Sequence, residues 1–339
     1  MRKYNLAIVG ATGAVGQELL RILAERSFPY DPESLKLLAS ERSAGKKINY
    51  QGREYTVEAT AAASFGGVDI ALFAGGAASK LFAREAVAKG AVVIDNSSTF
   101  RYDDDVPLVV PEINPRDAAR HQGIIANPNC STIQMVMALK PISDAVGLKR
   151  VIVSTYQAVS GAGMEAIAEL SRQTSLINQG QEVVPEVFPH QIAFNLIPQI
   201  DVFLENGYTK EEMKMVWETR KILGIPGLAI CATAVRAPVY RSHSESINIE
   251  TIKPLSVKEA KELLAAAPGV KVLDDPEQNL YPMPCQASHS DLVYVGRIRE
   301  DISCQNGLAF WVVSDQLRKG AATNAVQIAE LVIEKGVKR

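Results

Sequence analysis

The stretch Asn5–Gly16, which reads NLAIVGATGAVG, sets the expectation for the fold. It opens with the apolar run Leu6–Val9, which has the length and composition of a buried β-strand. Three glycines follow at three-residue spacing, where a helical pattern begins. Such glycines allow a tight turn, close approach of backbone N–H groups to a pyrophosphate, and close helix–strand packing. We therefore predict a dinucleotide-binding turn rather than an ordinary glycine-rich turn. The predicted contacts are Gly10, Thr12, Gly13, Ala14, Val15 and Gly16.

Short apolar segments alternate with longer amphipathic ones from residue 4 to about residue 127. This alternation is typical of βαβ units around a parallel sheet. We therefore predict an N-terminal α/β domain with a Rossmann-like, doubly wound parallel sheet. The predicted strands are Asn5–Val9, Leu35–Ala39, Asp69–Ala74, Ala91–Asp95 and Gly123–Ala126, and the predicted helices lie near Gly13–Arg26 and Ser79–Lys89.

The pattern changes after Asn127–Asn129, where β-rich stretches begin to follow one another in groups. This grouping predicts an α+β C-terminal domain with a mixed or antiparallel sheet. We expect residues 1–128, completed by a C-terminal helix at about 320–339, to bind the dinucleotide. Residues 129–319 are expected to form the catalytic, substrate-binding and dimerisation domain. The β-rich stretches are 150–157, 228–236, 243–253, 292–300 and 308–314, and the last helix is expected at about Ala322–Lys335.

Composition excludes several classes of protein. The 339 residues are 47% hydrophobic and 22% charged, with a formal net charge of −2, so neither nucleic acid nor an anionic membrane is an expected partner. The first apolar run is too short for a signal peptide, and no stretch has the length of a transmembrane helix. The four cysteines lie far apart without a CxxC pair, which argues against a disulfide framework and against a metal site. We expect a protein of the reducing cytoplasm.

The end of the second predicted strand, Ala39–Ser43, bears on the choice of nicotinamide cofactor. An NAD enzyme usually places an acidic residue here for the ribose 2′-hydroxyl. This chain instead offers two serines and an arginine, which suit the 2′-phosphate of NADP, although Glu41 leaves use of NAD open. Arg42 is otherwise an ordinary loop charge. The predicted 2′-phosphate contacts are Ser40, Arg42 and Ser43.

Cys130 is the strongest candidate for a nucleophile. It follows Asn127–Asn129 and precedes the helical pattern Ile133–Leu139, so it should lie at a helix N-terminus. Unpaired N–H groups and the positive end of the helix dipole favour a thiolate there and can also stabilise an oxyanion. A thiol with a pKa of about 8.5 is about 3% ionised at pH 7, whereas a pKa of about 7 gives about one half. The alternative is an inert buried cysteine.

A proton carrier is needed beside this sulfur, and the chain has four histidines. His243 has the most favourable neighbours, because strand alternation would place Arg241 and Glu245 on its face of a strand. Such a cluster is expected to hold the pKa of the imidazole near neutrality for acid–base work. The alternative is a hydrogen-bonded structural histidine.

Five separated segments together resemble the aspartate-semialdehyde dehydrogenase family and run through nearly the whole chain. They are Gly10–Gly16, Asn96–Arg101, Asn127–Thr132, Tyr156–Gly163 and Arg236–Glu245. The resemblance implies an NADP-dependent, phosphorylating aldehyde dehydrogenase of lysine, threonine, methionine and isoleucine biosynthesis. It also implies a homodimer or a tetramer.

The resemblance also implies a role for individual residues. Cys130 would be the nucleophile and His243 the acid–base catalyst, with Gln157 orienting the substrate and Asn129 near the reacting carbon. Arg236 would bind the substrate carboxylate, although by itself it reads as a salt-bridge partner at a strand end. The remaining implied contacts are Arg101 and Lys221 for phosphate, Glu218 for the substrate ammonium group, and Ser160, Gly161, Gly163 and Asn324 for the cofactor.

Taken without the resemblance, Arg101 is a loop charge, and Glu218 with Lys221 is a surface ion pair on a helix. Two rival functions remain. One is a reductase of N-acetylglutamyl phosphate, whose substrate has no free ammonium group, so Glu218 discriminates against it. The other is a dinucleotide-sensing module without turnover, for which Cys130 and His243 would be superfluous.

Overall fold

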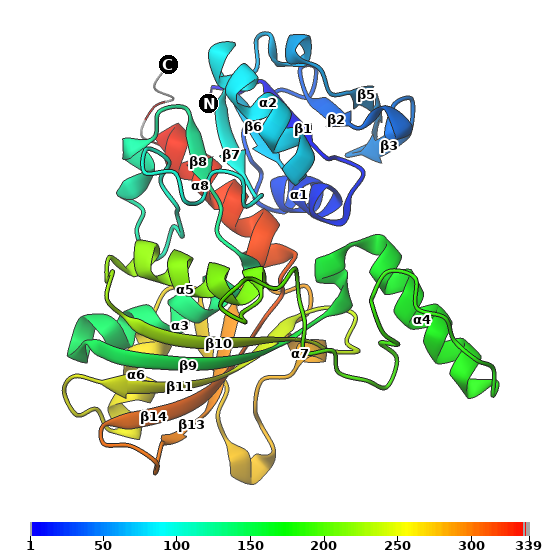
Figure 1. Cartoon of the computed structure of the whole chain (residues 1–339). Helices are drawn as coiled ribbons and strands as arrows, with labels where there is room; N and C mark the ends of the chain where they lie inside the picture. The colour runs from blue at the N-terminus through cyan, green and yellow to red at the C-terminus, as the bar shows by residue number, and fades with distance from the viewer. Residues whose placement is uncertain (1, 335, 337–339) are drawn as a thin grey trace. The chain divides into compact units, whose positions relative to one another are not determined.

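The computed structural model describes residues 2–334 and 336, which form two compact units (Figure 1). One unit contains the chain up to Asn129 and again from Ala321, and the other spans Cys130–Gly320. Each unit has its own six-stranded sheet.

The first unit is built on a parallel sheet of order β5-β2-β1-β6-β7-β8. The central strands are apolar and fully buried, as expected for a sheet covered on both faces. The predicted Rossmann-like fold class is thereby confirmed. Its elements are β1 (Leu6–Val9), α1 (Ala14–Glu25), β2 (Lys36–Ala39), β3 (Lys47–Tyr50), β4 (Arg53–Thr56), β5 (Glu58–Ala59), β6 (Ile70–Phe73), α2 (Gly76–Ala88), β7 (Val92–Asp95), β8 (Ile124–Ala126) and α8 (Thr323–Glu334).

The last helix, α8, belongs to the core of this unit. Ala325 and Ile328 are fully buried in the same apolar cluster as Leu6 and Ile8 of β1. Small and branched apolar side chains recur along α8 at three- and four-residue spacing, which places them on one face of the helix, where they can be buried together. Lys335, where the sequence prediction ended this helix, lies outside the described residues.

Sequence reasoning missed a small hairpin, β3–β4, in which Lys47 pairs with Thr56 and Tyr50 with Arg53. Gln51 and Gly52 form its two-residue loop, and both have positive φ, at 49° and 78°. This is the backbone of the tight turns that match the twist of two antiparallel strands. Glycine at the second loop position was the available signal.

The second unit has a mixed sheet of order β10-β9-β11-β14-β13-β12, with parallel pairs at both edges and antiparallel pairs between them. The predicted mixed sheet is thereby confirmed. Its elements are α3 (Cys130–Val146), β9 (Leu148–Gln157), α4 (Met164–Asn178), α5 (Lys210–Leu223), β10 (Ala229–Arg236), β11 (His243–Thr251), α6 (Val257–Ala266), β12 (Val270–Val272), α7 (Pro284–Ala287), β13 (Val293–Glu300) and β14 (Gly307–Ser314).

Helices α3, α5 and α6 pack on one face of this sheet, whereas α4 extends away from it (Figure 1). Along β11 the alternate residues His243, Glu245 and Ile247 are fully buried, and Ser246 between them is only half-buried. The helix-covered face therefore carries the buried side chains, and we call the opposite side the open face. Among the described residues, the helices are all too short or too polar to cross a membrane.

Candidate active site

The glycine-rich turn joins β1 to α1 in the first unit. Gly10 has a φ of 86°, and a Cβ on Gly16 would lie 2.2 Å from the Gly10 carbonyl oxygen, so both positions require glycine. The N–H groups of Gly10 and Ala11 both donate to the Leu38 carbonyl of β2, at 2.8 and 3.0 Å. The turn is thus fixed against the second strand, with its helix starting at Ala14.

The residues predicted to contact the ribose 2′-phosphate lie beside this turn. Glu41–Ser43 form a 3₁₀ turn directly after β2, and the Thr12 hydroxyl donates to the Ser43 hydroxyl at 3.4 Å. Ser40 and Arg42 are exposed, and Ser43 is buried. The structure therefore brings the glycine turn and the serine–arginine turn together, as the sequence prediction requires.

Arg101 and Asn324 belong to a buried polar network of the first unit. The guanidinium of Arg101 donates to the carbonyls of Asn127 at 2.9 Å and of Asn96 at 2.8 Å. The side-chain amide of Asn324 donates to Asn127 Oδ1 at 2.7 Å and to the Val109 carbonyl at 3.0 Å. Asn127, which precedes the candidate nucleophile by three residues, is the shared partner that orients both side chains.

Cys130 is the first residue of α3, as predicted. Its side chain is partly exposed, whereas Asn129 before it and Ser131 after it are buried. The sulfur thus begins a 17-residue helix whose first-turn N–H groups have no intrahelical acceptor. Gly320 lies against it, because a Cβ added there would be 3.0 Å from the Cys130 Cβ. Sequence reasoning did not predict that Gly320 lies beside Cys130, and the only indication in the sequence is that the residue is a glycine.

His243 is fully buried at the start of β11, and its ring is fixed by the backbone. The N–H of Ala158 donates to His243 Nδ1 at 3.0 Å, so the neutral imidazole carries its proton on Nε2. That Nε2 lies 3.4 Å from Nε2 of Gln157. Burial and the nearby charge of Arg236 hold the pKa of His243 well below its usual 6.5.

The predicted triplet of Arg241, His243 and Glu245 on one strand face is wrong in part. β11 begins only at His243, because Ser242 has a φ of 74° and breaks the extended backbone. Arg241 instead pairs with buried Asp315 at 2.5 Å. Burial raises the pKa of Glu245 well above 4.5. The expected tuning of the histidine pKa to neutrality therefore fails, because the neighbouring charge is Arg236 and not the carboxylate.

Gln157 ends β9, and its amide is held from both sides. Its Nε2 donates to Glu211 of α5 at 3.2 Å, and its Oε1 accepts from the Thr155 hydroxyl at 3.0 Å. These partners turn the amide nitrogen toward His243. Sequence reasoning missed Glu211, which the fold brings in from 54 residues away and for which the sequence carries no pattern.

Arg236 ends β10 beside this pair and is buried. Its Nη1 donates to the Ala158 carbonyl at 2.7 Å, and the Phe188 ring centre lies 5.8 Å from its Cζ. Burial lowers the pKa of Arg236, and the charges of Glu211 and Cys130 oppose that shift. The cation, the imidazole and the sulfur therefore lie within one electrostatic neighbourhood of the second unit.

The 3₁₀ turn Val159–Ala162 closes over this neighbourhood. A Cβ on Gly161 would lie 3.1 Å from Arg236 Nη1 and 3.3 Å from His243 Cε1, so a larger residue would press on both. Gly163 has a φ of 96°. The sequence-predicted Ser160 and Gly161 are thus beside the candidate catalytic residues.

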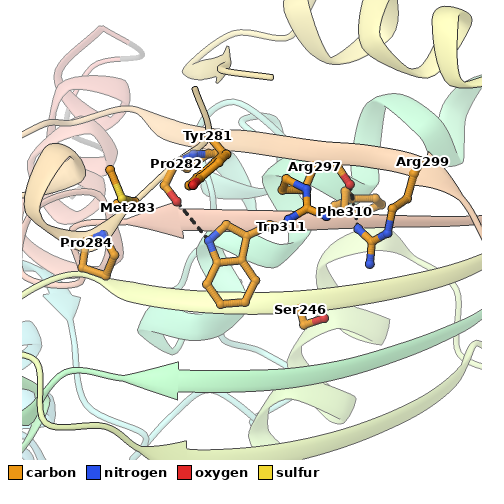
Figure 2. Close-up of a pocket in the computed structure, with 9 residues that line it drawn as sticks. All are labelled: Ser246, Tyr281, Pro282, Met283, Pro284, Arg297, Arg299, Phe310 and Trp311. Carbon is orange, nitrogen blue, oxygen red and sulfur yellow. Dashed lines mark hydrogen bonds between the residues drawn. The ribbon is translucent and has the colours of Figure 1, made fainter. Parts of the chain in front are cut away.

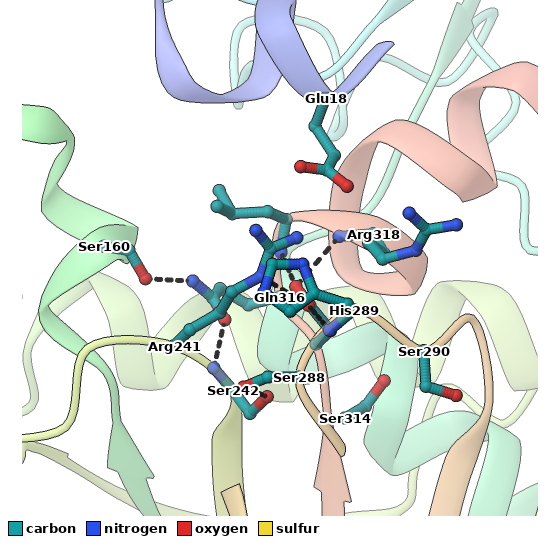
Figure 3. Close-up of polar contacts among 12 residues, drawn as sticks. Glu18, Ser160, Arg241, Ser242, Ser288, His289, Ser290, Ser314, Gln316 and Arg318 are labelled. Carbon is teal, nitrogen blue, oxygen red and sulfur yellow. Dashed lines mark hydrogen bonds and ion pairs between the residues drawn. The ribbon is translucent and has the colours of Figure 1, made fainter. Parts of the chain in front are cut away.

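Gln316 links this turn to the histidine (Figure 3). Its Nε2 donates to the Ser160 hydroxyl, and its Oε1 accepts from the backbone N–H of Ser242 at 2.7 Å. Ser242 directly precedes His243, so one buried amide ties the two backbone segments that fix the imidazole. Sequence reasoning missed Gln316, which has no repeating pattern around it.

Helix α5 carries the predicted Glu218 and Lys221. Glu218 is fully buried, whereas Lys221 is exposed one turn later. The helix starts with a capping box in which Thr209 and Glu212 exchange hydrogen bonds, and Glu212 also accepts from Ala234 N of β10 at 2.9 Å. The cap therefore sets the position of α5 against the strand that ends in Arg236.

A separate pocket of about 350 Å³ lies on the open face of the same sheet (Figure 2). It is lined by Ser246 of β11 and Trp311 of β14, and the Trp311 indole donates to the Pro282 carbonyl at 3.1 Å. Ser246 faces away from His243 and Glu245 because strand side chains alternate. This pocket is therefore distinct from the candidate active site.

Within the described ranges, 2–334 and 336, we found no cluster of three histidine, cysteine or acidic side chains able to hold a metal ion.

Comparison with known proteins identifies the family. Residues 5–121 match the family model "Semialdehyde dehydrogenase, NAD binding domain", and residues 139–319 match "Semialdehyde dehydrogenase, dimerisation domain". An aspartate-semialdehyde dehydrogenase of Aquifex aeolicus is 58% identical over 98% of this chain and 99% of its own.

Solved structures agree. Aspartate semialdehyde dehydrogenase II of Vibrio cholerae, complexed with ASA, is 49% identical with a TM-score of 0.95 over 98% of this chain and 99% of that chain. Aspartate semialdehyde dehydrogenase of Candida albicans, with NADP, is 25% identical with a TM-score of 0.75 over 99% of this chain and 100% of that chain. This chain therefore belongs to the aspartate-semialdehyde dehydrogenase family of oxidoreductases.

Proposed function

We propose that this enzyme interconverts aspartyl 4-phosphate and aspartate 4-semialdehyde with NADPH, through a thioester on Cys130. The product would serve the biosynthesis of lysine by way of diaminopimelate, and of threonine, methionine and isoleucine. The observation that supports this most directly is the convergence of Cys130, His243, Gln157 and Arg236 in the second unit. We assign cofactor binding to residues 1–128 with 320–339, and catalysis, substrate binding and dimerisation to residues 129–319.

The covalent steps use the helix-start cysteine. In the biosynthetic direction, the Cys130 thiolate adds to the acyl carbon and phosphate leaves, which forms the thioester. Hydride addition to the same carbon gives a thiohemiacetal oxyanion, whose collapse releases the aldehyde and regenerates the thiolate. NADPH supplies that hydride when bound. Asn129, directly before the sulfur and buried, is assigned a contact near the reacting carbon.

His243 and Gln157 are assigned contacts with the oxygen bonded to that carbon. Because Ala158 occupies Nδ1, the Nε2 of His243 is the nitrogen that exchanges a proton with the substrate oxygen. The amide nitrogen of Gln157, held by Glu211, donates at the same place. In the oxidative direction the hydroxyl proton of the thiohemiacetal would pass to Nε2 of His243, which requires the tautomer with its proton on Nδ1 and therefore the loss of the hydrogen bond from the Ala158 N–H.

Charge complementarity assigns the substrate groups. Arg236 is a buried cation beside the sulfur and is assigned the α-carboxylate. Glu218 is assigned the ammonium group of the substrate. Arg101 and Lys221 are assigned the phosphate, because a guanidinium and an ammonium group donate hydrogen bonds suited to an anion.

NADP is the proposed cofactor. The glycine turn admits a pyrophosphate at the start of α1, since residues 10 and 16 leave no room for a side chain. Ser40, Arg42 and Ser43 are assigned the 2′-phosphate, whereas Ser160, Gly161, Gly163 and Asn324 are assigned the nicotinamide end. Exposed Glu41 leaves room for NAD as a weaker substitute. The four free cysteines fit the reducing cytoplasm, where we place the protein.

One assay tests the proposal. Absorbance of the reduced nicotinamide is followed with aspartate semialdehyde and NADP, with and without phosphate. We expect phosphate-dependent reduction that Cys130→Ser nearly abolishes, with NADP affinity kept within a few-fold. Cys304→Ser, at an exposed cysteine, is the matched control and should keep full activity. Activity of Cys130→Ser above a tenth of wild type would refute the thioester.

The substrate assignment has a separate test. The rival substrate, N-acetylglutamate semialdehyde, has no free ammonium group for Glu218 to bind. We expect a strong preference for aspartate semialdehyde, which Glu218→Gln should reduce. Equal activity of the wild type on both aldehydes would contradict the assignment, and absence of any phosphate-dependent NADPH formation would favour a sensing module.

We further propose that two copies associate through the open face of the second unit. The region 139–319 matches a dimerisation domain, and the rings of Tyr156 and Trp311 pack there at a tilt of 42°, with ring centres 5.5 Å apart, while both side chains remain partly exposed. Light scattering should give twice the chain mass of 36.7 kDa, or four times if dimers pair. Trp311→Arg should shift the mass toward 36.7 kDa. A wild-type monomer at micromolar concentration would refute the interface.

A further inference from the structure

A segment of the second unit, which we call the strap, follows α4 in the sequence and contacts both α4 and the end of β10 in space. The strap comprises residues 186–197, all of them described, and has no helix or strand. Its backbone N–H groups must therefore find partners outside regular structure. Those partners come from two side chains on one face of α4, four residues apart.

Glu169 and Gln173 are these two side chains, and both are buried. Glu169 accepts three strap N–H groups, from Glu186 at 2.9 Å, Val187 at 2.6 Å and Phe188 at 3.3 Å. Gln173 donates to the Glu169 carboxylate at 2.7 Å. Through its own Oε1, Gln173 accepts from the N–H groups of residues 192 and 193 at 2.9 and 3.1 Å. Hydrogen bonds to a carboxylate are among the stronger ones in proteins, so this cluster determines the path of the strap.

The strap in turn contacts Arg236. The Phe188 ring lies on its guanidinium, with 5.8 Å between Cζ and the ring centre. Ile197 exchanges two backbone hydrogen bonds with Arg236, at 2.8 and 3.0 Å. On its other side, the guanidinium donates to the Ala158 carbonyl. The arginine is thus held between the strap and the turn that follows β9.

We propose that Glu169 is a positioning residue for substrate recognition, acting through the strap to hold Phe188 against the guanidinium of Arg236. This rests on the proposed role of Arg236 as the ligand of the substrate carboxylate. With one face of the guanidinium covered and one nitrogen bound to Ala158, the remaining N–H groups keep a fixed direction for that carboxylate. A carboxylate ligand requires this direction, because its pairing with arginine is planar.

The experiment compares two aldehydes. Aspartate semialdehyde uses Arg236, whereas 3-aminopropanal is the same molecule without the α-carboxylate. In Glu169→Ala, kcat/KM for aspartate semialdehyde should fall about tenfold or more, through KM, as expected when a charged pair loses its geometry. The value for 3-aminopropanal and the KM for NADP should stay within about threefold, so the ratio between the aldehydes falls.

Two more variants complete the test. Phe188→Leu keeps the bulk but not the ring face, and should lower the same ratio. Glu186→Gln is the matched control, because this carboxylate belongs to the strap but is exposed and pairs with Arg172 at 2.8 Å. It should leave the ratio unchanged. Hydrogen exchange of the strap amides should accelerate in Glu169→Ala and not in Glu186→Gln.

The outcomes separate the two proposals. Equal loss on both aldehydes in Glu169→Ala, or no loss in either variant, would overturn the positioning role. A wild-type enzyme inactive on aspartate semialdehyde would instead refute the proposed function, while the hydrogen-exchange result would still report whether Glu169 holds the strap. If Glu169→Ala does not fold, an unchanged ratio in Phe188→Leu would by itself overturn the proposal.

Discussion

The buried carboxyl group of Glu245 should make this protein more stable when it is replaced by an amide. Glu245 lies on the helix-covered face of β11 and is 0% exposed. Neither of its oxygens has a hydrogen-bond partner among the described residues. Gln134 of α3 is close enough to lower the carboxyl pKa, but it makes no bond of acceptable geometry with it, and burial raises that pKa well above 4.5.

The sign follows from proton binding. Above pH 4.5 the unfolded chain releases the Glu245 proton, whereas the folded protein retains it until the pH reaches the raised pKa. The folded state then binds more protons, so its stability falls as pH rises through that window, by up to about 1.4 kcal/mol per pH unit. A neutral amide has no such dependence. The stability of Glu245→Gln relative to wild type should therefore rise with pH, by about 1 kcal/mol or more between pH 5 and pH 8 if roughly one pH unit of the window falls in that range.

Urea unfolding between pH 5 and pH 8 measures this difference. The only two tryptophans of the chain, Trp217 and Trp311, lie in the second unit with Glu245, so their fluorescence reports its unfolding. Glu262→Gln on α6 is the matched control, because Glu262 is exposed. The reasoning is refuted if the stability difference between Glu245→Gln and wild type is the same at pH 5 and pH 8, or shrinks.

Three further changes should have separable effects. Thr209→Ala removes the capping oxygen of α5, so the free energy of unfolding should fall by about 1 kcal/mol; an unchanged urea midpoint would contradict this. Gly16→Ala puts a methyl 2.2 Å from the Gly10 carbonyl oxygen, and calorimetric titration should show NADPH binding lost while tryptophan fluorescence is kept. Since burial and Arg236 keep His243 neutral when folded, stability should be full above pH 6.5 and fall below it; His243→Gln should flatten that acid slope, and an identical slope in both proteins would argue against a buried neutral ring.

The fold was predictable where the sequence is periodic. The apolar run Leu6–Val9, followed by spaced glycines, is a local signal, and the strand and the helix start lie within one residue or so of the prediction. The same holds for Cys130, because a polar turn followed by a helical pattern identifies a helix start. The hairpin Lys47–Thr56 was not predicted, because its strands are short and largely polar and the alternation of apolar and polar residues in them is therefore weak.

The candidate site was predictable only as a set of residue types. The sequence neighbours of His243 and then the resemblance selected that residue, and the resemblance alone selected Arg236, but neither indicated which groups hold the two side chains. The backbone N–H of Ala158 has no side chain to reveal it, and Glu169 acts on the strap through hydrogen bonds to backbone. The error over Arg241 has the same cause, since a left-handed residue before the strand is invisible to an argument from alternation.

The same contacts explain how recognition and chemistry are joined in this fold. The Ala158 N–H donates to His243, and the Ala158 carbonyl accepts from Arg236, so the backbone of one residue positions both side chains. With Nδ1 occupied, His243 presents an N–H toward the amide nitrogen of Gln157, which Glu211 holds in the same donor orientation. Two donors that lie 3.4 Å apart cannot satisfy each other, and the proposed mechanism assigns the oxygen that accepts from both to the substrate. A carboxylate bound at Arg236 would offset part of the charge that lowers the pKa of His243, so substrate binding would raise that pKa.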